Sequence, residues 1–359
     1  MKFDLGMLSE PIVLAPLAGG PSTPELAAAV SNAGGLGFVA GGYKQARALA
    51  EDIRRTTELT SRPFGVNLFV PGHASTSEAA ISMYANSLED AFRKFDTMPG
   101  RAQWDDDGWH EKLELLKTNP VPVASFTFGC PSADVVGALR NVGTAVWVTV
   151  TDVDEALAAS AMGADVLVGQ GIEAGGHRAS FTDRDTGGDL GTLALVQLLR
   201  SCTALPLVAA GGIADGGGVA AVLAAGAAAA QIGTAFLRCP EAGTSDVHRR
   251  ALLEGRSTVI TRAFTGRRAR GLVNQFIVDH ENDALCAYPE VHHLTAPLRA
   301  AARRAGDPEF VNLWAGQSHH LGQDIPAADL VQQLGRECRR TLTDVAGRMP
   351  PGPVEALRS

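Results

Sequence analysis

Short, continuous apolar runs recur along the chain and alternate with longer segments of mixed polarity. Runs without polar alternation are typical of parallel strands that are covered on both faces, and the segments between them have the length of crossover helices. The runs lie at residues 12–15, 37–40, 64–69, 123–128, 145–150, 165–169, 207–210 and 228–232. Eight such units predict an α/β fold, a TIM (β/α)8 barrel.

Helix boundary signals agree with this pattern. Thr23 and Pro24 predict a helix start directly before residues 25–31, because threonine caps helix N-termini and proline fits the first helical turn. Asp152 similarly opens a helix that we expect over residues 153–162.

Two stretches do not fit a minimal barrel. Residues 73–119 predict extra helices and a surface loop inserted after the third strand, and the acidic run 105–107 within them is interpreted as a solvated loop rather than a metal site. We therefore expect a barrel over residues 1–239 that includes this insertion, and a mainly helical cap with the substrate region over residues 240–317. Residues 318–359 are expected to form a C-terminal helix that packs back on the barrel, followed by a frayed tail.

The composition indicates a folded globular protein. Of the 359 residues 45% are hydrophobic and 19% are charged, which excludes disorder as the main state. The formal net charge of -8 argues against a nucleic-acid partner, since phosphate backbones are bound through clustered positive charge. The longest uncharged stretch, residues 216–237, is mostly Ala and Gly and is better explained by a short helix and a strand than by a membrane span.

The cysteines and histidines predict neither a disulfide framework nor a metal site. The five cysteines are scattered without a Cys-x-x-Cys pair, and no histidines have the spacing of a zinc motif. The pairs His292-His293 and His319-His320 are interpreted as cap or surface residues. The N-terminus lacks the apolar segment of a signal peptide, so a cytoplasmic protein is expected.

The positions of the lysines narrow the chemistry. They are found at Lys2, Lys44, Lys94, Lys112 and Lys117, and none follows strands five to eight, where a barrel enzyme that forms a Schiff base would most plausibly carry one. No cysteine follows the sixth strand, which disfavours a barrel dehydrogenase with a thiol nucleophile. Noncovalent chemistry, or chemistry performed by a cofactor, remains.

Glycines gather where a barrel commonly binds phosphate. The seventh run ends in Gly211-Gly212 and the eighth in Gly233-Thr234. Without side chains, backbone N–H groups can approach phosphate oxygens closely, and the Thr234 hydroxyl could add a donor. Either cluster alone could be a tight turn, but together they favour phosphate binding. Residues 216–221 imitate a dinucleotide fingerprint, yet no acidic residue follows at the required distance, so we interpret them as a helix start.

The segment after the sixth strand, residues 169–178, is the most informative. Gly175-Gly176 exposes backbone to a ligand, and His177 beside it lies at a predicted strand end, where a general base near neutral pH would be useful. His177 could equally bond a neighbouring loop, and Arg178 could bind an anion or lie on the surface.

Residues 14–37 resemble the opening signature of the nitronate monooxygenases, formerly called 2-nitropropane dioxygenases. The resemblance covers most of the chain in the expected order. It continues through residues 67–69, 170–178, 209–213, 231–234 and 313–317. After His177-Arg178 the family usually has glycine, whereas this chain has Ala179.

The resemblance implies an FMN-dependent enzyme that oxidises alkyl nitronates, such as propionate 3-nitronate, with O2 to a carbonyl compound and nitrite through a flavin semiquinone, without reduced nicotinamide. It implies that His177 is the active-site base. The residues that would contact FMN are Asn67, Gln170, Gly175, Gly212, Gln231, Ile232, Gly233 and Thr234. Tyr288, His293 and Trp314 are candidates for the substrate wall in the cap, although core packing explains each of them too. A homodimer is a candidate assembly.

Other functions remain open at this point. NAD(P)H:quinone reductases and FMN-dependent enoyl-acyl-carrier-protein reductases look similar around residues 173–177. A non-redox barrel enzyme that binds phosphate would also use the glycine clusters, but it would purify colourless. A flavin-binding protein without catalysis would be yellow but inert.

Overall fold

The structure, a computed structural model, describes residues 3–74, 77–183 and 189–348, so the tail expected to be frayed lies outside the described residues. Its centre is a sheet of eight parallel strands in the order β1-β9-β8-β6-β5-β4-β3-β2. A parallel bridge between Val13 and Leu36 brings β1 beside β2, so the sheet nearly closes into the expected barrel. The strands are β1 (Ile12–Leu14), β2 (Gly37–Ala40), β3 (Phe64–Phe69), β4 (Val123–Thr127), β5 (Ala145–Val150), β6 (Val166–Gln170), β8 (Leu207–Ala210) and β9 (Ala229–Ile232).

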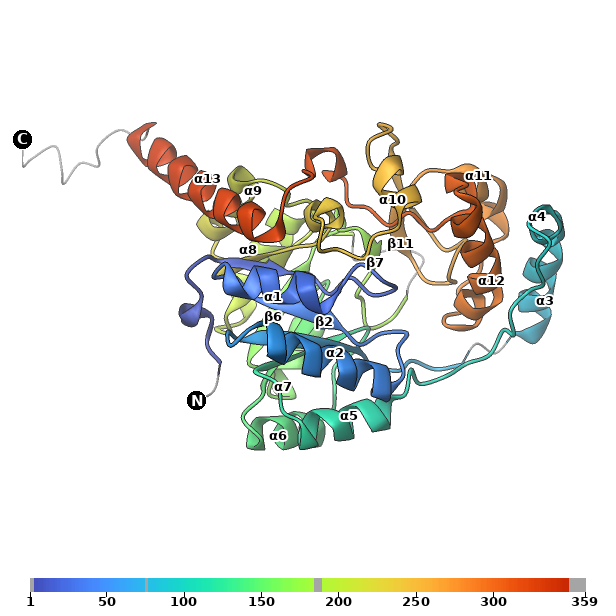
Figure 1. Ribbon diagram of the computed structural model, residues 1–359. Helices are drawn as coiled ribbons and strands as arrows, with labels where there is room; N and C mark the ends of the chain where they lie inside the picture. Colours follow the sequence, from blue (N-terminus) through green and yellow to red (C-terminus); the bar gives the residue numbers. More distant parts are fainter. Residues whose placement is uncertain (1–2, 75–76, 184–188, 349–359) are drawn as a thin grey trace, which may run out of the picture.

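Helices cover the outside of the barrel (Figure 1). They are α1 (Pro24–Asn32), α2 (Ala46–Leu59), α5 (Trp109–Thr118), α6 (Ala133–Asn141), α7 (Val153–Ala161), α8 (Thr192–Cys202), α9 (Gly216–Ala224) and α13 (Ala327–Arg348). The two predicted helix starts are confirmed, because Thr23 Oγ1 accepts from the Leu26 N–H at 3.0 Å and the Asp152 carboxylate accepts from the Glu155 N–H at 2.8 Å.

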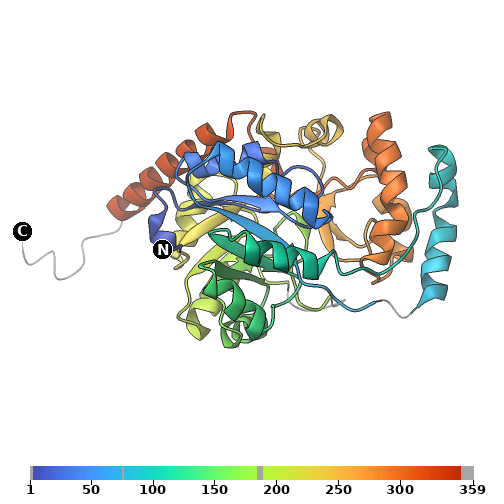
Figure 2. The ribbon, with the colours of Figure 1, turned by 60° about the horizontal axis from the view of Figure 1, so that its bottom comes forward.

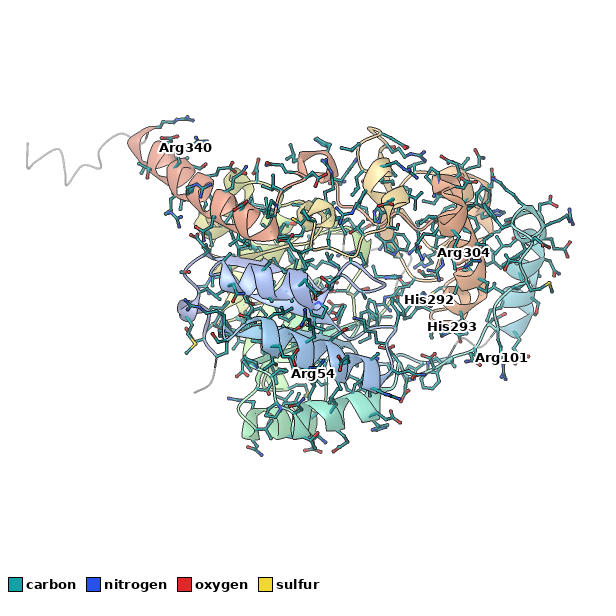
Figure 3. All side chains as sticks on the ribbon, in the orientation of Figure 1. Arg54, Arg101, His292, His293, Arg304 and Arg340 are labelled. Carbon is teal, nitrogen blue, oxygen red and sulfur yellow. The ribbon has the colours of Figure 1, made fainter. Side chains whose placement is uncertain are left out.

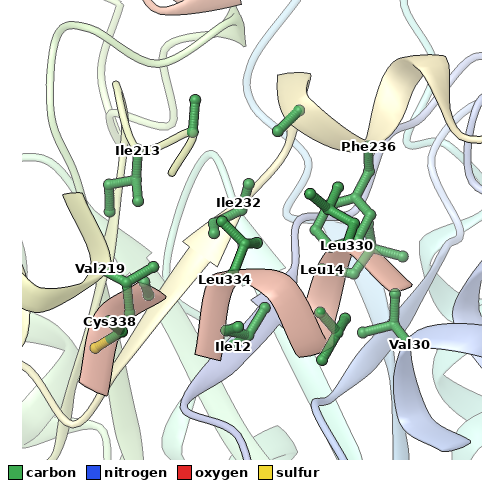
Figure 4. Close-up of a cluster of buried hydrophobic side chains, with 14 of the residues drawn as sticks. Ile12, Leu14, Val30, Ile213, Val219, Ile232, Phe236, Leu330, Leu334 and Cys338 are labelled. Carbon is green, nitrogen blue, oxygen red and sulfur yellow. The ribbon is translucent and has the colours of Figure 1, made fainter. Parts of the chain in front are cut away.

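The C-terminal helix α13 lies against α9 and α1, and the apolar side chains between them form one buried cluster (Figure 4). Leu330 and Leu334 of α13 pack there against Ile12 and Ile232 of the barrel strands. Burial of apolar surface, at about 25 cal/mol per Å² removed from water, therefore stabilises the attachment of α13.

A second layer stands at one end of the barrel (Figures 1 and 2). Its helices are α3 (Glu78–Ser87) and α4 (Glu89–Lys94) from the insertion, and α10 (Asp246–Ala251), α11 (Gln275–His280) and α12 (Glu290–Ala305). One buried cluster joins both groups, including Tyr84 and Phe92 from the insertion and Phe264 and Leu298 from the C-terminal part. The mainly helical cap is therefore built from two separate stretches of sequence.

The cap also holds a three-stranded sheet that the sequence pattern did not predict. It contains β10 (Thr258–Thr261), β11 (Ala269–Leu272) and β7 (Gly176–His177), in the order β10-β11-β7. His177 pairs antiparallel with Ala269, so the segment after β6 leaves the barrel and enters the cap. Short 3-10 turns complete the chain at η1 (Leu5–Met7), η2 (Thr234–Arg238), η3 (Glu281–Asp283), η4 (Pro308–Phe310) and η5 (His319–Leu321).

The acidic run is a loop, as the sequence suggested, but it is only partly solvated. Asp107 forms an ion pair of 2.7 Å with Lys112, whose side chain is only 1% exposed, and Asp105 lies 2.8 Å from the His293 ring. These two contacts join the run to α5 and to the cap helix α12. Within the described residues, no helix has both the length and the apolar character of a membrane span.

Candidate active site

A cavity of about 590 Å³ lies where the carboxyl ends of the barrel strands face the cap. This is the end of a (β/α)8 barrel that carries function, and the volume is in the range of cofactor and ligand sites. Eight of the residues singled out from the sequence line it: Asn67, Gln170, Gly175, His177, Gly212, Gln231, Gly233 and Thr234. The ninth, Ile232, is fully buried in the cluster beneath α13, so its side chain does not reach the cavity (Figure 4).

The glycine clusters form one wall of the cavity. Gly211 and Gly212 have φ of +114° and +69°, a conformation that side chains disfavour. A Cβ at Gly175 would lie 2.5 Å from the Gly316 nitrogen. The Gly316 N–H in turn donates to Thr234 Oγ1 at 3.0 Å, so this late segment of the chain lies directly over the strand ends. At Gly175, Gly211 and Gly212 a side chain would be crowded or strained, so these positions present bare backbone.

The loop that carries His177 is held by the side chain of Gln170. Gln170 Oε1 accepts from Arg178 Nη1 and from the Ala179 N–H, both at 2.9 Å, and Gln170 Nε2 donates to the His177 carbonyl at 3.1 Å. In the described part of this loop, residues 171–183, the φ angle is positive only at Gly176. Ala179, where the family usually has glycine, is fully buried and fits without strain.

His177 lines the cavity and is surrounded by aromatic side chains. Its Nε2 lies 2.9 Å from Thr265 Oγ1, and the rings of Phe128, Tyr288 and Trp314 are centred 5.5–5.8 Å away. Burial lowers the pKa of His177 to about 3, and the positive charges of nearby arginines add to this effect. The imidazole is therefore neutral at physiological pH, with Nε2 fixed by the threonine and Nδ1 left for the cavity.

Tyr43 and His292 line the cavity beyond His177, and Tyr288 contacts both Tyr43 and His177. The Tyr288 hydroxyl donates to the Tyr43 hydroxyl at 3.1 Å, and the Tyr43 ring stacks on His292 at 4.2 Å between centroids and 4° between planes. Figure 3 shows His292 on the side of α12 that faces the barrel. Burial raises the pKa of Tyr43 to about 12, so its phenol stays protonated.

Helix α12 places positive charge along the same cavity. His292, Ala296, Arg299 and Arg303 line it at intervals of about one helical turn, so they form one stripe of the helix. Arg299 donates to the His292 carbonyl at 2.7 Å and to Thr295 Oγ1 at 3.0 Å, and burial lowers its pKa to about 10. In the described part of the chain, no aspartate or glutamate lines the cavity, although the protein carries a net charge of -8. The arrangement favours an anionic ligand.

The nitronate monooxygenase family model matches residues 3–337. The chain belongs to this family. It is 40% identical over 348 residues to a nitronate monooxygenase of Paraburkholderia phytofirmans, with 93% of this chain and 94% of the relative covered. A nitronate monooxygenase of Pseudomonas aeruginosa is 41% identical, with 92% and 97% covered. As a family member the protein is a flavin-dependent oxidoreductase.

Two solved structures are similar to this chain over almost its whole length. A nitroalkane oxidase from Streptomyces ansochromogenes superposes with a TM-score of 0.92 at 47% identity, covering 94% of this chain and 99% of that one. FabK from Thermotoga maritima superposes with a TM-score of 0.74 at 28% identity, covering 96% and 98%.

In this nitronate monooxygenase family member, the residues predicted on the barrel strands line the cavity more completely than those predicted in the cap. Trp314 lines the cavity and Tyr288 packs on His177, but the His293 ring bonds Asp105. Tyr43 and Arg299 were not predicted. A signal for Arg299 was present in the sequence. Along α12, polar residues recur every three or four positions, which places His292, Arg299 and Arg303 on one face of the helix.

Proposed function

We propose that the protein oxidises alkyl nitronates, such as propionate 3-nitronate, with O2 to a carbonyl compound and nitrite, using FMN. The observation that carries this proposal is the shared cavity of His177 and Arg299. Among the described residues the buried Arg299 guanidinium has no carboxylate partner, and together with a neutral imidazole it suits a small anion better than a neutral substrate.

The barrel wall fits FMN. The backbone of Gly212 and Gly233 and the hydroxyl of Thr234 would hold the phosphate, because these residues line the cavity at the carboxyl ends of β8 and β9 and leave the main chain open to a ligand. Asn67 donates through Nδ2 to Ser125 Oγ at 2.8 Å, which leaves its carbonyl oxygen for an N–H at the flavin edge. Acceptance of electrons from the nitronate and their transfer to O2 is the chemistry that FMN supplies when bound.

His177 and Arg299 would divide the work on the substrate. Arg299 holds the negative charge of the nitronate, and its fixed position orients the anion beneath Trp314. When the substrate is a neutral nitroalkane, His177 Nδ1 removes the proton from carbon. With a pKa of about 3 His177 is a weak base, so the site acts mainly on nitronates that are already ionised.

The second candidate is an NAD(P)H-dependent reductase of quinones or of enoyl thioesters on the same scaffold. The similarity to FabK favours it, since it extends over 96% of this chain. Arg299 and Arg303 could then contact phosphates of a nucleotide instead of a nitronate.

Oxygen uptake by the FMN-loaded protein separates the two candidates. Propionate 3-nitronate should cause rapid uptake with release of nitrite, and NADH with a quinone should not be turned over. His177→Asn should lose activity on the neutral nitroalkane and weaken activity on the nitronate, whereas His110→Asn, an exposed histidine on α5, should match the wild type. Fast quinone reduction without nitronate turnover would reject the proposal.

A further inference from the structure

Tyr43 has an unusual main-chain conformation. It lies in the loop between β2 and α2, and its φ of +64° is in the left-handed region that residues with a side chain seldom adopt. Its N–H donates to Asp107 Oδ1 at 2.9 Å. This hydrogen bond crosses from the first loops of the barrel to the acidic run before α5, so it holds the strained residue from outside its own loop.

Asp107 is itself fixed by a buried charge. Its Oδ2 lies 2.7 Å from Lys112 Nζ, and the lysine side chain is 1% exposed. Desolvation raises the pKa of Asp107, while Lys112 and the Tyr43 N–H favour the charged carboxylate. One oxygen therefore neutralises Lys112, and the other holds Tyr43.

The side chain of Tyr43 connects this network with the cavity. Its ring covers His292 at 4.2 Å and meets the edge of Phe69 at 5.3 Å. Its hydroxyl accepts from Tyr288, whose ring is centred 5.6 Å from that of His177. A change in the Tyr43 backbone would therefore displace the wall next to His177, although Asp107 does not line the cavity.

We propose that Asp107 is a positioning residue for the substrate end of the cavity. By accepting the Tyr43 N–H, it holds the Tyr43 ring on His292 and the two tyrosine hydroxyls together, and this sets the space available to the substrate beside His177. The consequence for substrate binding rests on the proposed function. The placement of Tyr43 by Asp107 is independent of the proposed function. The placement and its effect on substrate binding are therefore tested by separate measurements.

Three double variants isolate the hydrogen bond from the ion pair. Asp107→Asn with Lys112→Met removes both charges and keeps an oxygen that can accept from Tyr43. Asp107→Leu with Lys112→Met also removes both charges and keeps the branched shape, but it offers no acceptor. Both variants lose the same ion pair, but Asp107 itself has a φ of +55°, which asparagine tolerates better than leucine. Asp107→Gly with Lys112→Met removes the acceptor without this strain, so a shift lost in both the Leu and the Gly variant and kept in the Asn variant reports the hydrogen bond. Asp106→Asn, in the same acidic run, is the control, because within the described residues the Asp106 side chain accepts a hydrogen bond only from the Gly108 N–H.

The first readout is the ring-current shift of His292 in the full-length holoenzyme with labelled histidine, assigned through His292→Gln. The stacked Tyr43 ring shifts the His292 ring protons upfield. We expect the Asn variant to keep this shift and the Leu and Gly variants to lose it. The second readout is steady-state kinetics with propionate 3-nitronate, where the Leu variant should raise KM about tenfold with kcat nearly unchanged.

A retained shift in either the Leu or the Gly variant would overturn the proposal, and so would equal loss of the shift in all three double variants. Loss of the shift in the Leu variant with an unchanged KM would refute the role in substrate binding. If the wild type does not oxidise the nitronate at all, the proposed function fails, and the His292 shift still decides whether Asp107 places Tyr43.

Discussion

Replacement of Arg299 by methionine should make the protein more stable and a poorer enzyme. Arg299 is buried beside the cavity, and within the described residues it has hydrogen bonds to Thr295 and His292 but no carboxylate partner. Methionine keeps an unbranched apolar stem of similar reach, so Arg299→Met removes the charge with little change in packing. A charged residue that is retained for substrate binding should destabilise the protein when no substrate is bound, because its charge is then buried without a partner of opposite charge.

The size of the effect follows from the pKa. Burial lowers the pKa of Arg299 from 12.5 to about 10, and a shift of this size corresponds to roughly 3 kcal/mol against the charged form. Loss of the hydrogen bonds to Thr295 and the His292 carbonyl costs about 1 kcal/mol in return. We therefore expect Arg299→Met to raise the free energy of unfolding by about 2 kcal/mol, in line with replacement of other buried charges.

Urea unfolding of the holoenzyme at pH 7.5 and fixed FMN concentration measures the stability, and oxygen uptake measures the activity. KM for the nitronate should rise roughly 10- to 100-fold, since a hydrogen bond to a charged group contributes about 1.5–3 kcal/mol. Arg304→Met is the matched control, because this exposed arginine of α12 does not line the cavity. A variant that is less stable than the wild type, or whose KM is unchanged, would refute the argument.

Four further predictions concern the barrel wall and its loops. Because the pKa of His177 is about 3, kcat/KM for the preformed nitronate should show no inflection near pH 6.5, and an inflection there would contradict a neutral histidine. The folded-state pKa lies below the unfolded value of 6.5, so His177 contributes stability that is present above pH 6.5 and lost as the pH falls toward 3; in urea unfolding, the wild type should lose up to about 2 kcal/mol more than His177→Asn between pH 8 and pH 5. Gly175→Ala should displace Gly316, because the new Cβ would lie 2.5 Å from its nitrogen, and should lower the amount of FMN that stays bound after gel filtration. Full retention of FMN would show that the Gly316 segment can move without loss of the cofactor site. Glu173→Ala should lower the free energy of unfolding by about 1–2 kcal/mol in urea, because the Glu173 carboxylate caps α8 through the Thr192 N–H at 3.0 Å, and an unchanged value would exclude that role.

The barrel could be predicted because its signal is local. A parallel strand buried on both faces is a continuous apolar run, so residues 37–40, 64–69, 145–150 and 207–210 have the same bounds in the sequence pattern and in the structure. The glycines at strand ends were equally visible, since the fold itself dictates where a barrel exposes backbone.

The cap could not be predicted in the same way because distant segments build it. The strand β7 has only two residues and exists through its pairing with β11, some 90 residues later, so no local period marks it. Asp107 lay in a run of three acidic residues, a pattern typical of solvated loops. Its partner Lys112 follows five positions later, but only the packing of α5 shows that this lysine is buried.

The pairing of His177 with Ala269 has a consequence for protein engineering. The segment that bears the histidine is a strand of the cap sheet, while Gln170 at the end of β6 fastens the same segment to the barrel. A chimaera that takes residues from 240 onward from a relative would pair the relative's β11 with the β7 of this chain. The strand pairing that positions His177 would then be formed between two different sequences. Recombination between relatives should therefore transfer residues 170–181 together with the cap, so that the donor's strand pairing and its histidine arrive as one unit.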